Sequence, residues 1–284
     1  MKKFILWSLA FLITIFAAVY QRMTGPTYPK RIKVTINNSV KELKLLRTLS
    51  LAEKPELRLD LSNSNITAKL FFKQYRSDGD YQTAMFIYRD DQKHPGFFAE
   101  VPQQPVAGKL QYYIEITDLN GTKTYLKDNP VVIRFKGDVP AFVLIPHILL
   151  MFIAMLFSTL AGLMAIIKYP AYKKYALWTL ILFIAGGMVL GPVVQYFAFH
   201  DFWTGIPFGW DLTDNKTLIA LIFWILAVVM NRKKDKPVYT ILAAIILLLV
   251  FSIPHSLFGS EFNYSTGHVT QLSLIHISEP TRPY

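Results

Sequence analysis

The sequence predicts a membrane protein of mixed α and β structure, with an N-terminal transmembrane helix, an extracytoplasmic antiparallel β-sandwich and a C-terminal bundle of four transmembrane helices. Its 284 residues are 52% hydrophobic and only 17% charged, whereas roughly a quarter of the residues in a soluble domain are charged. The apolar residues gather in uncharged runs, and a membrane helix needs about 20 such residues. This composition excludes a wholly soluble enzyme. The runs are 4–20, 141–167, 176–198, 217–230 and 237–253.

The formal net charge of +11 is unevenly distributed between the two predicted sides of a membrane. Lysine and arginine cluster at 2–3, 168–174 and 232–236, whereas the loop 199–215 is acidic. Because cytoplasmic loops are enriched in lysine and arginine, the basic clusters are predicted to be cytoplasmic and residues 23–139 extracytoplasmic. A bacterial inner membrane is the natural setting. The charge therefore indicates the lipid bilayer as a partner and argues against nucleic acid.

Residues 1–22 are predicted to form an N-terminal membrane anchor. A cleaved signal peptide has the same basic start and apolar core, but residues 16–21 offer no clean small-x-small cleavage site. We therefore favour an anchor over a signal peptide. The chain contains no cysteine, so the core of the extracytoplasmic segment must stabilise it without disulfides.

Residues 23–139 alternate apolar and polar side chains, which is typical of half-buried β-strands. Turn-forming residues separate the alternating segments, and Asn120-Gly121 is the strongest hairpin signal among them. This pattern predicts a sandwich of short antiparallel strands. The apolar positions are Ile32, Val34 and Ile36; Leu57, Leu59 and Leu61; Ile66, Ala68, Leu70 and Phe72; Met85 and Ile87; and Leu110, Tyr112, Ile114 and Ile116.

The stretch 108–121, Gly-Lys-Leu-Gln-Tyr-Tyr-Ile-Glu-Ile-Thr-Asp-Leu-Asn-Gly, resembles the late hairpin of immunoglobulin-like or fibronectin type III-like modules in bacterial envelope proteins. The resemblance covers this one hairpin and implies a binding or spacer module. The sequence of this segment shows no Ser, His and Asp grouping and no Gly-rich phosphate loop. His94, beside Pro95, is interpreted as a solvated loop residue.

Residues 140–256 hold the other four runs and are predicted to form the helical bundle. Glycines at 162, 186 and 187 would let helices approach closely in lipid. Gly191-Pro192 should kink the third predicted membrane helix.

The run 217–230 is short for a membrane helix. It has 14 uncharged residues, or about 21 Å of helix against a hydrocarbon core of about 30 Å. We therefore expect this helix to begin earlier, with Thr213 or Asp214 as its N-cap.

Three histidines, His147, His200 and His255, lie at ends of predicted helices that the topology places on the extracytoplasmic face. Such imidazoles could ligate a transition metal or haem, with Asp211 and Asp214 as oxygen ligands or as hydrogen-bond partners of the histidines. No HxxxH or ExxH spacing accompanies them. The alternative is that they are ordinary interfacial residues.

Further polar residues are expected at the same face. Gln195 is a candidate hydrogen-bonding partner for a quinone or another ligand, or a cap for a neighbouring helix. Asp214, Asn215 and Lys216 would lie at the membrane boundary, where ionisable residues usually face a protein interior or a wet cavity. Alternatively, Lys216 reaches the headgroups or pairs with Asp211 or Asp214.

The segments 20–29, 203–205 (Trp-Thr-Gly) and 211–216 (Asp-Leu-Thr-Asp-Asn-Lys), within residues 1–271, together resemble an uncharacterised family of bacterial multi-pass inner-membrane proteins. The resemblance implies this localisation and supplies no catalytic residues.

The end of the sequence changes character. Residues 257–271 are expected to form an extracytoplasmic tail. The stretch 272–282, Leu-Ser-Leu-Ile-His-Ile-Ser-Glu-Pro-Thr-Arg, resembles a translated transposase-based sequencing adaptor at all eleven positions. We therefore expect residues 272–284 to be an artefact and His276 not to be a ligand.

Three functions fit these observations. The first is a non-catalytic envelope component for binding, sensing or assembly, with a protein partner or a second copy of itself. The second is a redox, metal or haem protein that uses the three histidines. The third is a small transporter with Asp214 and Lys216 in its path, although four helices are few for a transporter built from repeats. We favour the first, because it requires nothing unusual of any residue.

Overall fold

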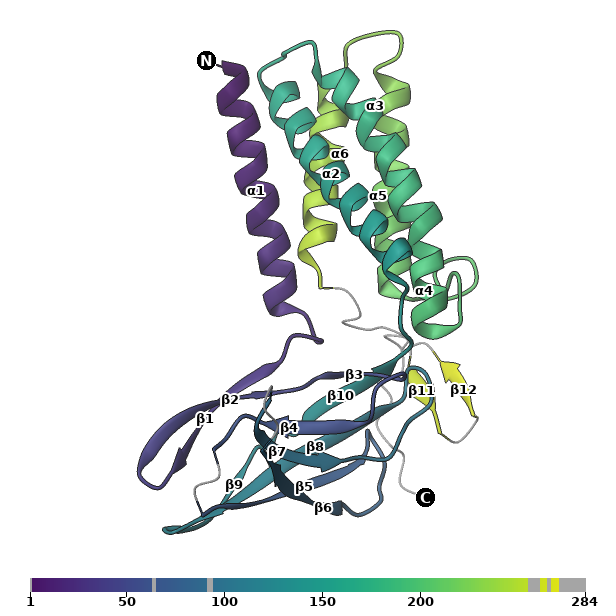
Figure 1. The fold of residues 1–284 in the computed structure, drawn as a ribbon. Helices are drawn as coiled ribbons and strands as arrows, with labels where there is room; N and C mark the ends of the chain where they lie inside the picture. Colours follow the sequence, from purple (N-terminus) through teal and green to yellow (C-terminus); the bar gives the residue numbers. More distant parts are fainter. Residues whose placement is uncertain (1, 63–64, 91–93, 255–260, 265–266, 271–284) are drawn as a thin grey trace, which may run out of the picture. The chain divides into compact units, whose positions relative to one another are not determined.

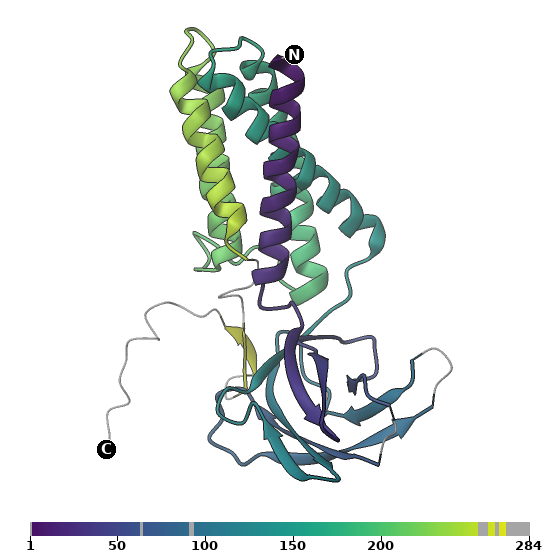
Figure 2. The ribbon, with the colours of Figure 1, turned by 90° about the vertical axis from the view of Figure 1, so that its left-hand side faces the viewer.

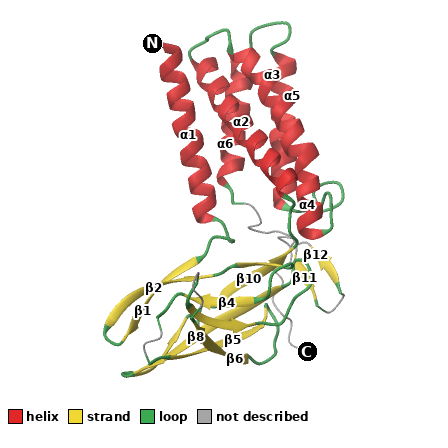
Figure 3. Cartoon of the chain, in the orientation of Figure 1, coloured by secondary structure: helices red, strands yellow, loops and turns green. Residues whose placement is uncertain are grey.

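A computed structural model describes residues 2–62, 65–90, 94–254, 261–264 and 267–270. Helices and strands occupy separate parts of the chain, as Figure 3 shows. The protein is therefore of mixed α and β structure, as predicted.

The chain divides into two compact units. Met1–Pro26 and Val139–Ser260 belong to the helical unit, whereas Thr27–Asp138 and Glu261–Thr270 belong to the β unit. Glu261–Thr270, which lie in the tail expected from the sequence, therefore group with the β unit.

The helices of the helical unit follow the apolar runs. They are α1 (Lys2–Thr24), α2 (Ala141–Ile166), α3 (Tyr172–Phe183), the π-helical segment η1 (Ile184–Leu190), α4 (Gly191–Phe199), α5 (Leu212–Met230) and α6 (Pro237–Ser252). Within the described part of the chain, four helices are long and apolar enough to cross a membrane: α1, α2, α5 and the continuous helix from α3 to α4. The apolar helix α6 has 16 residues, or about 24 Å.

The expectation of an N-terminal anchor separate from a C-terminal bundle is wrong, because α1 packs against α2 and α6 (Figures 1 and 2). Leu6, Ala10, Thr14 and Ala17 are buried on one face of α1. Their spacing of three to four residues places them on one helical stripe, and the small side chains allow close approach. Leu6 and Ala10 share a core with Met164 of α2.

The continuous helix from α3 to α4 departs from α-helical geometry before Pro192, near the predicted kink. Residues of η1 form a π-helical turn, and Pro192 is the second residue of α4. Proline has no N–H to donate to the preceding turn, and π-helical turns accommodate such interruptions.

α5 begins upstream of its uncharged run, as expected, but its N-cap is Asp211 and not Thr213 or Asp214. The Asp211 side chain accepts a hydrogen bond from the Thr213 N–H at 2.7 Å. This start lengthens α5 to 19 residues, or about 28 Å.

The β unit contains one eight-stranded sheet and two hairpins. The sheet order is β3-β10-β8-β5-β6-β7-β4, with β9 paired to β8, while β1 pairs with β2 and β11 with β12. The strands are β1 (Lys30–Ile36), β2 (Ser39–Leu45), β3 (Thr48–Ser50), β4 (Glu56–Leu59), β5 (Thr67–Gln74), β6 (Gln82–Arg89), β7 (Gly96–Glu100), β8 (Lys109–Asp118), β9 (Gly121–Tyr125), β10 (Val131–Lys136), β11 (Glu261–Asn263) and β12 (His268–Thr270).

Hydrogen bonding runs continuously from β3 to β4, so the strands form one curled sheet where two separate sheets were expected. Leu49 of β3, Leu57 of β4 and Val34 of β1 belong to the same buried core. The core is therefore enclosed by the curled sheet and the β1-β2 hairpin.

The alternation of the sequence predicts the inward side chains of most strands correctly. Leu70, Tyr112 and Ile114 are buried. A hairpin does join β8 and β9, but its two turn residues are Leu119 and Asn120, and Gly121 pairs with Asp118 as the first residue of β9. The exception among the strands is β6, where Phe86 is buried while Met85 and Ile87 are 50% and 64% exposed. Both faces of β6 are apolar, so its sequence could not tell which one faces the core.

Candidate functional site

The two ends of the helical bundle carry different polar residues. The start of α1, the α2-α3 connection and the α5-α6 connection lie at one end, and the α4-α5 loop lies at the other (Figures 1 and 2). The first end is basic and carries an exposed ion pair between Lys173 and Asp235. The second end contains the predicted site residues Gln195, Asp211, Asp214 and Asn215.

Asp214 is the centre of a buried hydrogen-bond network at this second end. Its Oδ2 atom accepts hydrogen bonds from the Thr204 N–H at 2.6 Å, the Thr204 hydroxyl at 3.1 Å and the Gln195 Nε2 at 3.2 Å. Gln195 Nε2 also donates to the Thr204 hydroxyl at 2.7 Å. One carboxylate oxygen therefore ties α5 to the end of α4 and to the intervening loop.

Neighbouring residues of α5 hold the same loop. The Asn215 Oδ1 accepts the Ile206 N–H at 2.7 Å, and the Asp211 N–H donates to the Thr204 carbonyl at 3.0 Å. A Cβ on Gly205 would lie 2.6 Å from the Asp214 Cβ, so only glycine permits this close approach. We name Gln195, Thr204, Asp211, Asp214 and Asn215 the Asp214 cluster. Its bonds secure the loop.

Lys216 is buried and lies apart from these partners. Its Nζ donates to the Ile253 carbonyl, at the end of α6, at 2.7 Å. No carboxylate of the described residues lies within ion-pair distance of Lys216, so the structure does not show the alternative ion pair with Asp211 or Asp214.

The described histidines are not brought into one ligand set. His147 Nδ1 hydrogen-bonds the Gly186 carbonyl of η1 at 2.9 Å. His200 is exposed, ends α4 in a left-handed conformation and packs edge-on against Tyr196. His255 lies outside the described residues. Within the described ranges, no three His, Cys, Asp or Glu side chains are grouped to hold a metal.

The outward face of the sheet in the β unit carries two exposed apolar side chains, Met85 and Ile87, together with aromatic rings that are partly or fully buried. Phe71 of β5 and Tyr113 of β8 stack with ring centroids 4.7 Å apart, and Tyr81 packs edge-on against Tyr113. Met85 and Ile87 lie on the same face of β6, because Phe86 between them points into the core. We name these five residues the exposed sheet face.

Sequence reasoning missed the exposed sheet face and the role of Asn231. Asn231 is buried at the basic end, where its Oδ1 accepts from the Tyr172 hydroxyl at 2.7 Å and from the Lys236 N–H at 2.8 Å. Its Nδ2 donates to the Ala227 carbonyl at 2.8 Å. The sequence signal for Asn231 was its position directly after the apolar run 217–230.

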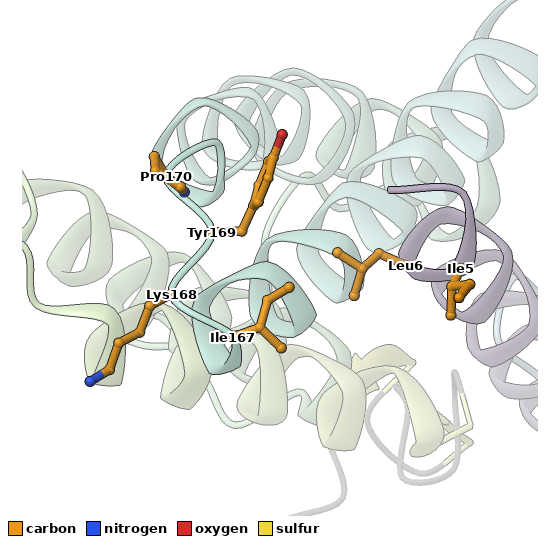
Figure 4. A pocket seen from close by; sticks show the side chains of 6 residues that line it. All are labelled: Ile5, Leu6, Ile167, Lys168, Tyr169 and Pro170. Carbon is orange, nitrogen blue, oxygen red and sulfur yellow. The ribbon is translucent and has the colours of Figure 1, made fainter. Parts of the chain in front are cut away.

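A shallow groove of about 380 Å³ lies at the basic end of the bundle (Figure 4). Ile5 and Leu6 of α1 form one wall, and residues 167–170 of the α2-α3 connection form the other. Lys3 Nζ lies 5.7 Å from the ring centroid of Tyr169. The lining is mainly apolar, so the groove offers contact area and not a reactive constellation.

The fold and these surfaces define a class: a protein with helices long and apolar enough to span a membrane and a separate β unit. Comparison with known protein families, with characterised proteins and with solved structures finds no match to this chain.

Proposed function

We propose that the protein is an integral protein of a bacterial inner membrane and that its β unit is an extracytoplasmic binding module. In this proposal the helices cross the membrane five times and hold the module at its surface. The protein acts by binding a partner in the envelope and not by catalysis.

The distribution of charge supports the orientation. Lys3, Lys168, Lys173 and Lys174 belong to the basic end of the bundle, and the positive-inside tendency assigns that end to the cytoplasm. The opposite end, with Asp201 in its loop, is then extracytoplasmic.

The return of the chain to the β unit supports the number of crossings. Lys109 Nζ pairs with Glu261 Oε2 at 2.9 Å, and the Tyr264 hydroxyl donates to Gln104 Oε1 at 2.7 Å. The residues that follow α6 must therefore lie on the same side of a membrane as β8. An even number of crossings between them, which α2, α3–α4, α5 and α6 supply, meets this requirement.

The strand order supports an immunoglobulin-like assignment of the module. In that fold the last two strands and the third strand are neighbours, and the second strand pairs with the fifth. The neighbours β10-β8-β5 and the pair β4-β7 are compatible with this arrangement.

The exposed sheet face is the observation that carries the binding proposal. Met85 and Ile87 remain 50% and 64% exposed, on the same side of the sheet as the stacked rings of Phe71 and Tyr113. Apolar patches on a water-facing surface mark interaction sites, and aromatic residues and methionine are enriched in interfaces. In contrast, the Asp214 cluster is committed to bonds within the chain.

Site-directed crosslinking tests the binding proposal, because the chain has no cysteine and a single one can be introduced anywhere. We expect Met85→Cys, labelled with a maleimide photocrosslinker in whole cells, to give a discrete adduct. The matched control is Lys44→Cys on β2, which is exposed and lies outside the eight-stranded sheet. An adduct of twice the chain mass would identify a second copy as the partner. The same crosslinked adducts from both variants would contradict a binding face on β6.

Single cysteines also test the orientation. A membrane-impermeant maleimide should label Lys44→Cys in intact spheroplasts and Lys174→Cys only after the membrane is permeabilised. Labelling of position 174 in intact spheroplasts would overturn the orientation.

A further inference from the structure

A small cavity of about 20 Å³ lies inside the helical bundle. Gln21 of α1, Phe183 of α3, Lys216 of α5 and Val250 of α6 contribute to its wall. The volume is sufficient for one water molecule or one monatomic ion. The cavity therefore suits a single small occupant.

Lys216 brings a positive charge to this cavity without a bonded counter-ion in the described part of the chain. The residue is only 4% exposed, and one of its three N–H groups donates to the Ile253 carbonyl. The sequence at 255–260, which follows α6, contains no acidic residue. Asp214, two residues before Lys216, is engaged with Thr204. Asp211 acts on the Lys216 charge only through space, without a hydrogen bond or ion pair to it. A buried ammonium without a paired anion is costly.

Gln21 brings a second unused donor to the same cavity. Its Nε2 atom is buried and has no hydrogen-bond partner in the described structure. An unpaired buried N–H group is destabilising, which favours any occupant that accepts a hydrogen bond.

We propose that this cavity binds one monatomic anion, of which chloride is the abundant example, between the Lys216 ammonium and the Gln21 amide. An anion accepts from both donors and neutralises the buried charge. A cation would face two donor groups and a like charge. A water molecule would accept the hydrogen bonds and leave the charge uncompensated. The inference concerns the bundle and does not rest on the proposed binding function of the β unit.

The test is the thermal unfolding of the full chain in mild detergent, followed by tryptophan fluorescence in sodium chloride and in sodium gluconate at equal ionic strength. All five tryptophans lie outside residues 27–138. We expect chloride at about ten times its dissociation constant to raise the Tm by roughly 3–6 °C over gluconate. Lys216→Met should abolish the difference and Gln21→Leu should reduce it. Lys168→Met, at an exposed lysine, is the matched control and should preserve it.

Equal Tm values for the wild-type chain in chloride and gluconate would overturn the proposal, as would a Lys216→Met variant that keeps the full chloride dependence. If Lys216→Met does not fold, the line width of the chloride-35 NMR signal decides. Wild-type protein should broaden it, and Gln21→Leu should broaden it less. No broadening by the wild-type protein would also overturn the proposal.

Discussion

The Asp214 carboxylate accepts the backbone N–H of Thr204 at 2.6 Å, and both residues are buried at one end of the helical bundle. The bond joins the first turn of α5 to a loop residue ten positions earlier in the chain. Gln195 reaches the same oxygen from α4. The acidic residue that the sequence marked as a transport or metal candidate is therefore a structural anchor of the loop.

Asp214→Asn should destabilise the helical unit by about 1.5–3 kcal/mol. The substitution removes the charge that strengthens these bonds and leaves a buried donor without an acceptor. The Tm in detergent measures the effect. Asp201→Asn, at an exposed position in the same loop, is the control and should have the Tm of the wild-type protein. An unchanged Tm for Asp214→Asn would show that the cluster does not hold the loop.

Asn231→Ala should cost about 2–3 kcal/mol at the opposite end of the bundle. The Tyr172 hydroxyl and the Lys236 N–H both lose their acceptor, and the end of α5 loses its link to the start of α6. Thermal unfolding measures the loss. The neighbouring Arg232→Ala changes an exposed residue and should leave the Tm within about 1 °C of the wild-type value, on the scale of ordinary surface substitutions.

Gly162→Ala should destabilise the packing of α2 against α6. The added Cβ would lie 2.6 Å from the Ala244 Cβ, so the helices must move apart, and overpacking of this kind costs about 1–3 kcal/mol. Gly191→Ala is the matched control, because its nearest contact would be an ordinary 3.7 Å to the Gly186 carbonyl oxygen. The idea of close packing at Gly162 fails if both variants unfold at the same temperature.

Glu56 should make the stability of the β unit depend on acid pH. Hydrogen bonds from Arg89, at 2.8 and 3.0 Å, lower the pKa of the Glu56 carboxyl below its ordinary value of 4.5, and Lys54 adds to the effect. Because the folded-state pKa is lowered, the carboxylate contributes stability above pH 4.5, and this contribution is lost as the pH falls through the folded-state pKa. The pair is partly exposed, so its worth is about 1 kcal/mol or less.

Calorimetry of the full chain between pH 7 and pH 3.5 measures this dependence. Glu56→Gln should lower the midpoint of the β-unit transition at pH 7 and flatten its fall toward acid pH. Asp80→Asn, at an exposed turn position, should leave both unchanged. If the midpoint of the Glu56→Gln protein falls with pH as in the wild-type protein, Glu56 does not cause the acid dependence.

The sequence singled out four residues of the Asp214 cluster, but it did not predict the hydrogen bonds that join them. Gln195, Asp211, Asp214 and Asn215 do come together, because the apolar runs and the short loop between two of them bring them to one end of the bundle. Their role depends on Thr204. The path of the folded loop points the Thr204 N–H at the Asp214 carboxylate. No local pattern encodes such a bond.

The sequence by itself determined the features that follow from local physical chemistry. Uncharged runs predicted the long apolar helices. A helix hydrogen-bonds its backbone polar groups internally, and apolar side chains can then face an apolar environment. Period-two alternation predicted the buried positions of most strands, such as Leu70 and Ile114, because successive side chains of a strand point to opposite faces.

Only the tertiary structure decided the features that depend on contacts between distant residues. The burial of Ala10 against α2, the outward direction of Met85 and the pairing of Glu261 with Lys109 are such features. A small residue in an apolar helix, an apolar residue in a strand that is apolar on both faces, and an acid in a tail each fit several environments equally well. The choice among these environments is made by packing, and packing is a property of the whole chain.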